Sequence, residues 1–201
     1  MINTSRNRAI VAHLVDPVAK ALLALRATPS GVSLVGALGA AFAALITFPF
    51  QEWWGGTIAV AIFACSDLLD GTMARLSGKE SVWGAFLDST LDRVTDGSVS
   101  LAILLGVVSW GEPVAVLIAG ISLIAGQVIP YAKARAEGLG LECNVGIAER
   151  PERTVLMLIF TLLSALDQIP LGLWVLGLLC ILSVITVLQR MLHVRRLLLA
   201  S

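Results

Sequence analysis

Six long apolar runs, separated by short polar stretches, dominate the hydrophobic pattern of the chain. They lie at about residues 31–50, 54–75, 83–108, 112–135, 153–168 and 171–192. Most of them approach the ~20 residues that an α-helix needs to cross the hydrocarbon core of a bilayer. The pattern predicts an all-α polytopic membrane protein with six transmembrane helices.

Residues 6–26 have a different pattern, in which apolar side chains occupy one broad helical face and polar side chains the other. A helix of this kind lies in the membrane interface. Asp16 and Pro17 have the pattern of an N-cap and a first-turn proline, which leaves open two short helices in place of one. We therefore expect an N-terminal juxtamembrane amphipathic segment over residues 1–27 and one six-helix membrane domain over residues 28–201.

Composition agrees with the membrane assignment. The chain is 57% hydrophobic and 14% charged, with a mean hydropathy of +0.89, which is too apolar for a soluble domain of this length. With six spans, all 14 Lys and Arg residues fall on one side of the membrane, and the other side holds acids but no base. By the positive-inside rule we expect a multi-pass protein of the cell's inner (plasma) membrane, with both termini and the basic face in the cytoplasm. Four tryptophans at the outer ends of the spans match an aromatic belt: Trp53, Trp54, Trp110 and Trp174.

Four carboxylates interrupt the second and third apolar runs. Asp67 and Asp70 are three residues apart, and Asp88 and Asp92 are four apart, so each pair lies on one face of its helix. One acid at the bilayer centre costs about 2.5–3.5 kcal/mol, so four together require positive charge between them. Carboxylate oxygens suit Mg²⁺, Mn²⁺ or Ca²⁺ better than Zn²⁺.

Small residues follow the first acidic pair. Gly71 lies one turn after Asp67 and has no side chain, and Ala74 continues the same face, so a bulky diphosphate could approach this helix closely. Arg75 follows at the membrane edge, where its guanidinium can hold a phosphate through two hydrogen bonds. In a structural alternative the acids only pair with bases between helices, but this leaves the Gly and Ala spacing unexplained. The bases in that alternative are Arg75, Lys79 and Arg93.

The spacing D-x-x-D-G-x-x-A-R-x8-G-x3-D-x3-D resembles the signature of the CDP-alcohol phosphotransferases at all eight fixed positions. They are Asp67, Asp70, Gly71, Ala74, Arg75, Gly84, Asp88 and Asp92. In that family an acceptor attacks a CDP-linked lipid at two metal ions, and CMP leaves. The resemblance implies two Mg²⁺ ions, or Mn²⁺, held by Asp67, Asp70 and Asp88. It further implies that Asp92 completes the metal site and acts as the catalytic base, and that the protein is a homodimer.

The start of the first span is a second candidate for contact with the CDP-lipid. Ser30, Gly31 and Ser33 are small, and a helix start exposes N–H donors that suit a phosphate, although the residues alone favour plain capping. The resemblance places part of the cytidine site in this stretch, Val32 included. Ser81, in the turn between the acidic helices, is near enough to touch the nucleotide. The full CDP-lipid set is Ser30, Gly31, Val32, Ser33, Asp67, Gly71, Ala74, Arg75 and Ser81.

Bases at the ends of the last three spans are candidates for the acceptor. Lys133 and Arg153 lie where they can point toward the acids, and Arg195 follows the last span. Their charges favour an acceptor that carries a phosphate. The other charges have simpler interpretations. Arg135 and Arg150 are equally well explained as positive-inside charges with local ion pairs, and Arg190 and Arg196 are expected at lipid head groups. Arg93 and Asp96 are expected to support the acids or pack helices, although Asp96 could be a further metal ligand.

The stretches around Lys133 and Arg153 resemble those of the actinobacterial phosphatidylinositol phosphate synthases. The resemblance implies transfer of a phosphatidyl group from CDP-diacylglycerol to inositol phosphate in the lipid bilayer, with no nucleic-acid partner. A phosphatidylglycerophosphate synthase that uses glycerol 3-phosphate is the alternative within the family. A divalent-cation transporter is an alternative from another class, but no acid continues the path to the outer side. A metal-dependent prenyltransferase would not explain Gly71, Ala74, Arg75 and Gly84.

Overall fold

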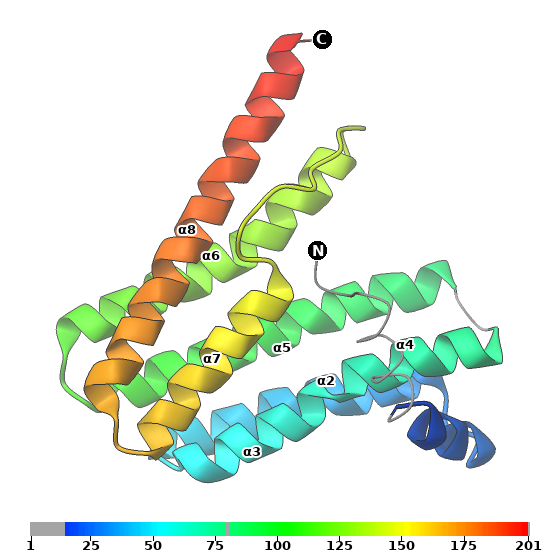
Figure 1. Ribbon diagram of the computed structural model, residues 1–201, viewed down its shortest axis with the longest axis horizontal. Coiled ribbons are helices and arrows are strands. Elements are labelled where there is room, and N and C mark those ends of the chain that lie inside the picture. Colours follow the sequence, from blue (N-terminus) through cyan, green and yellow to red (C-terminus); the bar gives the residue numbers. More distant parts are fainter. Residues whose placement is uncertain (1–14, 79–80, 201) are drawn as a thin grey trace, which may run out of the picture. The chain divides into compact units, whose positions relative to one another are not determined.

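The computed structural model describes residues 15–78 and 81–200, and within them it has helices and no β-strand (Figure 1). Residues 15–24 form one helix, with Asp16 and Pro17 inside it. The later elements are α2 (Pro29–Thr47), the 3₁₀ helix η1 (Phe48–Phe50), α3 (Trp53–Ala64), α4 (Ser66–Ser77), α5 (Val82–Val108), α6 (Pro113–Glu137), α7 (Arg150–Ala165) and α8 (Ile169–Ala200). The first part of the predicted amphipathic segment, residues 1–14, and Lys79 lie outside the described residues.

The six predicted apolar runs correspond to α2 with η1, α3 with α4, α5, α6, α7 and α8. Four helical segments of the described chain are long and apolar enough to cross a membrane: Pro29–Phe50, Trp53–Ser77, Pro113–Glu137 and Ile169–Leu199. The prediction of an all-α polytopic membrane protein is therefore confirmed. The count of six spans stays a prediction, because α7 has only 16 residues and α5 carries several charged residues.

The chain divides into two compact units. The first takes in the chain up to Ala41 together with Ala59–Thr95, and the second takes in Phe42–Ile58 together with the chain from Asp96 onward. The first unit therefore holds the four acids of the sequence motif. The second holds the bases expected at the acceptor.

Close helix packing in the first unit depends on two glycines of α2. A Cβ atom at Gly36 would overlap the side chain of Ser66, and one at Gly39 would overlap the ring of Phe63. The missing side chains let α2 lie directly against the second span. Thr95 of α5 adds a hydrogen bond to the carbonyl of Ala37, at 3.4 Å.

The second span is broken between α3 and α4. At the break the Cys65 N–H bonds to Ile62 O, three residues back. Cys65 Sγ also contacts Ala61 O at 3.3 Å, and Ser66 Oγ donates to Phe63 O at 2.6 Å. Side-chain donors thus satisfy backbone carbonyl groups that could not form hydrogen bonds with lipid.

An aromatic cluster joined by Gln51 organises one end of the second unit. The indole N–H groups of Trp53 and Trp110 donate to Gln51 Oε1 at 3.1 and 2.9 Å, and Gln51 Nε2 donates to Gly106 O at 2.8 Å. Trp53 stacks on Phe48 with ring centroids 5.2 Å apart. Trp53 is only 6% exposed, so it belongs to the core and not to the predicted outer belt.

In the rest of the second unit, α8 packs along α6 and α7 (Figure 1). The connection between α6 and α7 is fastened to α8, because Ala148 N donates to Thr186 Oγ1 at 3.0 Å. Gly146 lies beside the same threonine with a φ of +137°, and a Cβ there would come within 2.6 Å of Thr186 Cγ2. Glycine is therefore required at this point of the loop.

Candidate functional site

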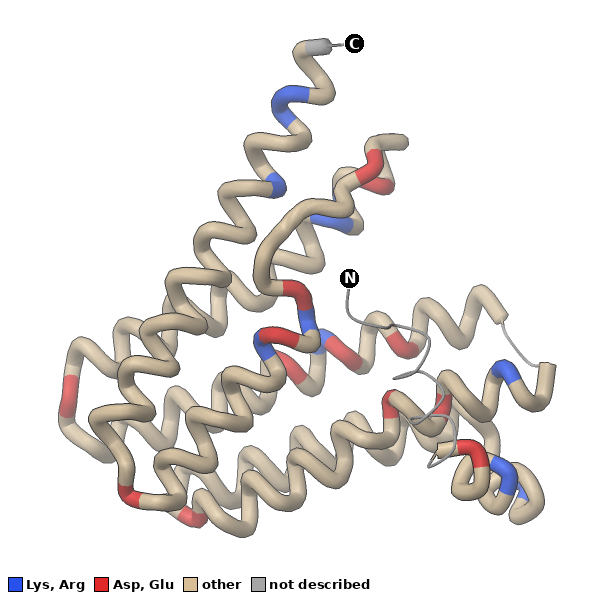
Figure 2. Tube along the Cα trace, in the orientation of Figure 1, with Lys and Arg blue, Asp and Glu red and all other residues tan. Residues whose placement is uncertain are grey.

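The acids of the motif occupy α4 and α5, as the acidic positions in Figure 2 show. Asp70 is 7% exposed and more buried than the other three. The hydroxyl of Ser33, on α2, donates to Asp70 Oδ2 at 2.5 Å. The structure thus joins a predicted nucleotide-contacting residue directly to a predicted metal ligand.

Three of the four carboxylates lie near one another. Asp67 and Asp88 are both close enough to Asp70 for their negative charges to act on it. Within residues 15–78 and 81–200, no three His, Cys, Asp or Glu side chains already stand as the ligand set of one ion. The grouped oxygens, in an apolar surrounding, have the chemistry of a divalent-cation site.

The space beside Gly71 is open. A Cβ atom built there would meet only Nη1 of Arg75, at 4.0 Å. The exposed Arg75 turns back along α4, where its Nη2 donates to Thr72 Oγ1 at 3.0 Å. A phosphate group could therefore approach the backbone of α4 at Gly71, next to a guanidinium.

At the starts of two helices, one backbone N–H group is already bonded to a side chain of the protein. Gly31 N donates to Thr28 Oγ1 at 3.1 Å, which makes Thr28 the N-cap of α2. Gly84 N donates to Ser81 Oγ at 3.0 Å, so Ser81 caps α5 in the same way. Ser30 and Val32 are half-buried in the first turn of α2.

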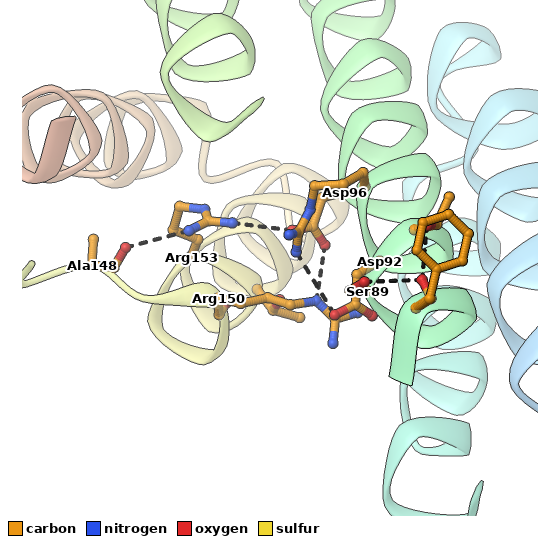
Figure 3. A network of polar contacts seen from close by, with 10 residues as sticks. Ser89, Asp92, Asp96, Ala148, Arg150 and Arg153 are labelled. Atoms are coloured by element: carbon orange, nitrogen blue, oxygen red, sulfur yellow. Dashed lines mark hydrogen bonds and ion pairs between the residues drawn. The ribbon is translucent and has the colours of Figure 1, made fainter. Parts of the chain in front are cut away.

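Asp92, the predicted base, lies on α5 (Figure 3). Its carboxylate is 3.7 Å from the guanidinium of Arg93. Its side chain is 16% exposed. This ion pair joins neighbours within α5 and is not the pairing between helices of the structural alternative.

Asp96, one turn further along α5, forms ion pairs with two guanidinium groups at the start of α7 (Figure 3). Arg150 Nε lies 3.3 Å from Asp96 Oδ1, and Arg153 Nη2 lies 3.1 Å from Asp96 Oδ2. Arg153, which is 4% exposed, also donates to Ala148 O at 3.3 Å. Asp96 thus packs α5 against α7, and the partner of Arg150 lies 54 residues away in the sequence and not among the local acids that the sequence analysis considered.

The other two predicted acceptor residues have different surroundings. Lys133 Nζ lies 4.0 Å from Glu137 Oε1, one turn away on α6. Arg195 is exposed on α8 and lines a cavity between α6 and α8. The described contacts do not bring Lys133, Arg153 and Arg195 to a shared partner.

The expectation that Arg190 meets lipid head groups is wrong. Its side chain is 1% exposed and donates to the backbone oxygens of Val145 and Ile129 and to Oε1 of Glu149. A signal was available in the sequence, because Arg190 lies inside the last apolar run, and a base in a membrane span usually faces the protein interior.

The chain matches a known family over most of its length. The match to the CDP-alcohol phosphatidyltransferase family covers residues 26–189. The chain is 42% identical to the phosphatidylinositol phosphate synthase of Mycolicibacterium smegmatis over 199 residues, which cover 94% of this chain and 86% of that protein. It is 41% identical to the protein of the same name from Cutibacterium acnes, with 94% and 96% of the two chains covered.

The chain also resembles solved structures. The crystal structure of the Mycobacterium tuberculosis phosphatidylinositol phosphate synthase with CDP-DAG bound has a TM-score of 0.85 and 36% identity, over 91% of this chain and 94% of that one. The same M. tuberculosis protein in complex with manganese and citrate has a TM-score of 0.82 and 37% identity, over 89% and 87%. By sequence, by fold and by the acids of α4 and α5, this chain belongs to the CDP-alcohol phosphatidyltransferase family.

Proposed function

We propose that the protein transfers the phosphatidyl group of CDP-diacylglycerol to inositol phosphate, releasing CMP and making phosphatidylinositol phosphate. The observation that carries this proposal is the grouping of Asp67 and Asp88 around the buried Asp70, in a chain about 40% identical to phosphatidylinositol phosphate synthases. The solved relative with CDP-DAG bound supports the lipid substrate.

The carboxylates of Asp67, Asp70, Asp88 and Asp92 would hold two Mg²⁺ ions, or Mn²⁺ in their place, and a relative solved in complex with manganese supports a divalent metal. When bound, such ions neutralise the diphosphate and stabilise the departing CMP oxygen. Ser33 donates its hydroxyl to Oδ2 of Asp70, which fixes the orientation of this carboxylate.

The CDP-lipid would lie along α4 and the start of α2. Gly71 and Ala74 leave room for the diphosphate, and Arg75 stands beside that room. The further contacts that we propose are Ser30, Gly31, Val32, Ser33 and Ser81.

Asp92 would act as the base. It takes the proton of the acceptor hydroxyl, whose oxygen bonds to the phosphorus of the phosphatidyl group while the bond from that phosphorus to the CMP oxygen breaks. Arg93, 3.7 Å away, helps to hold the carboxylate in position.

Lys133, Arg153 and Arg195 would bind the phosphate of the acceptor. Arg153 is the best supported of the three, because Asp96 and Ala148 O fix its guanidinium at the N-terminus of α7, where the helix dipole favours an anion. A phosphorylated acceptor matches these bases better than free inositol. Glycerol 3-phosphate carries the same charge and is the second candidate.

We also infer that the membrane domain takes in residues 28–201, behind an interfacial segment of residues 1–27. Both termini and the acids would face the cytoplasm from the inner membrane, as the positive-inside rule suggests. Family resemblance and glycine-rich spans favour a homodimer.

The test is a transfer assay on the purified full chain with CDP-diacylglycerol. Inositol phosphate, free inositol and glycerol 3-phosphate are offered separately, each with Mg²⁺, with Mn²⁺ and with excess chelator. We expect CMP release with inositol phosphate, little with free inositol, and none with chelator. Equal rates with glycerol 3-phosphate would assign the enzyme to phosphatidylglycerophosphate synthesis, and CMP release that resists the chelator would refute the metal site.

A further inference from the structure

A cavity of about 610 Å³ lies between α6 and the end of α8, in the second unit. Its walls are apolar or aromatic side chains, Val128, Ala132, Met191 and Leu198 among them, apart from three arginines. Among the residues that the structure describes, no acidic side chain lines it. The apolar part of the cavity suits a hydrocarbon chain, and its few polar groups are arginine guanidiniums that suit an anion.

Two of the arginines give the cavity a charge preference. Arg190 is occupied by Glu149 and backbone carbonyls. Arg135 and Arg195 are both exposed, and neither has a hydrogen bond or ion pair with another residue of the described chain. Two guanidiniums with no acid beside them attract an anion.

The depth of the cavity in a membrane follows from the length of α8. Its 32 residues rise about 48 Å, whereas the hydrocarbon core of a bilayer is about 30 Å thick. The last turns of α8 therefore extend to the level of the lipid head groups. Arg135 and Arg195 flank the cavity at this end of α6 and α8, where a lipid phosphate would lie.

We propose that this cavity binds an anionic phospholipid of the bilayer, with an acyl chain between α6 and α8 and its phosphate on Arg135. The occupant is a bystander lipid and not the CDP-lipid that we assign to α2 and α4. The inference depends on membrane insertion and holds whether or not the proposed transferase activity is correct.

The test is native mass spectrometry of the full chain in detergent, titrated with phosphatidylglycerol or with phosphatidylcholine of the same acyl chains. Arg135→Gln should weaken phosphatidylglycerol binding about ten-fold, the loss expected for one charge-assisted contact, and should weaken phosphatidylcholine binding less, because choline offsets the charge of its phosphate. Arg196→Gln is the matched control, because Arg196 is exposed on the same end of α8 and does not line the cavity. It should leave the affinity within about two-fold.

A second variant tests the cavity itself. Ala132→Phe fills the space with a ring while keeping both arginines, and should also weaken phosphatidylglycerol binding. We expect this lipid to raise the melting temperature of the parent and to have no such effect on Ala132→Phe. Equal losses in Arg135→Gln and Arg196→Gln would mean only diffuse surface charge, and unchanged binding in Ala132→Phe would place the lipid elsewhere. Displacement of phosphatidylglycerol by equimolar CDP-diacylglycerol would assign the cavity to the substrate and overturn the proposal.

Discussion

Arg190 donates from Nη2 to Oε1 of Glu149 at 2.7 Å, linking the interior of α8 to the residue just before α7. The same guanidinium bonds to Val145 O in the loop and to Ile129 O in α6. One side chain thus holds three segments that are 41 to 61 residues away in the sequence.

Arg190→Met should therefore lower the thermal stability of the protein in detergent. Removal of the donors leaves buried carbonyl groups unsatisfied, at a cost of about 1–3 kcal/mol each. The melting temperature of the purified protein measures the effect, and limited proteolysis within residues 138–149 should become faster. Arg196→Met, at an exposed position, should change neither.

Asp96→Asn should impair the acceptor side of the reaction. The change removes the negative charge beside the buried guanidinium of Arg153, which costs about 3–5 kcal/mol when a buried pair is broken. The KM for inositol phosphate should rise while the KM for CDP-diacylglycerol moves little. In a double-mutant cycle, Asp96→Asn with Arg153→Gln should be less damaging than the sum of the two single changes. Additive effects would mean that Asp96 does not act through Arg153.

Asp92→Asn and Asp67→Asn should fail in different ways. The first keeps the shape of the side chain but cannot accept a proton, so transfer should stop while Mn²⁺ and CDP-lipid binding largely remain. The second should weaken Mn²⁺ binding itself, as measured by calorimetric titration. Asp167→Asn, the same chemical change in the loop before α8, should leave both unaffected. Near-parental turnover by Asp92→Asn would exclude Asp92 as the base.

Gly71→Ala should affect stability and substrate binding in opposite directions. A Cβ at Gly71 meets no atom closer than 4.0 Å, and alanine favours a helix interior by about 0.8–1.0 kcal/mol over glycine. The variant should melt at or above the parental temperature and yet bind CDP-diacylglycerol more weakly, because the methyl group occupies space assigned to the diphosphate.

Gly36→Ala is the comparison variant for this pair. Its Cβ would overlap the side chain of Ser66, so the melting temperature should fall. An unchanged CDP-diacylglycerol affinity in Gly71→Ala would mean that the open space does not hold the diphosphate.

Single cysteines, introduced after the native ones are replaced by serine, should report the orientation. In intact cells a membrane-impermeant thiol reagent should label Glu52→Cys, Glu112→Cys and Asp167→Cys, and should label Lys79→Cys and Glu142→Cys only after the cells are opened. Labelling of position 79 from outside would overturn both the six-span topology and the cytoplasmic placement of the acids.

Local sequence patterns were sufficient to predict the helices and the acidic motif. Apolar runs set the helix positions to within a few residues, except that α8 continues to Ala200, well past the predicted end at about residue 192. The three- and four-residue spacings put Asp67 with Asp70 and Asp88 with Asp92 on their helices. The grouping of Asp88 with Asp70 was expected from the motif and is present in the first unit.

Partners far apart in sequence were not predictable in this way. Asp96 pairs with Arg153, 57 residues away in the sequence, and hydrophobic periodicity gives no information about which distant residues come into contact. Arg190 was assigned to lipid head groups together with Arg196, although its place in an apolar run favoured burial. Trp53 was assigned to the interface because tryptophan prefers that depth, whereas Gln51 supplies an acceptor that lets its indole enter the core.

The break at Cys65 gives the second span two lengths of helix in place of one. Backbone hydrogen bonds make a continuous helix stiff, but here the adjoining turns are linked partly by the side-chain atoms Cys65 Sγ and Ser66 Oγ. Asp67 and Asp70 therefore stand on a separate twelve-residue rod, α4. Because the hydrogen bond from Ser33 to Asp70 and the close approach of Gly36 to Ser66 join this rod to α2, the two carboxylates are positioned by a neighbouring helix as well as by their own span.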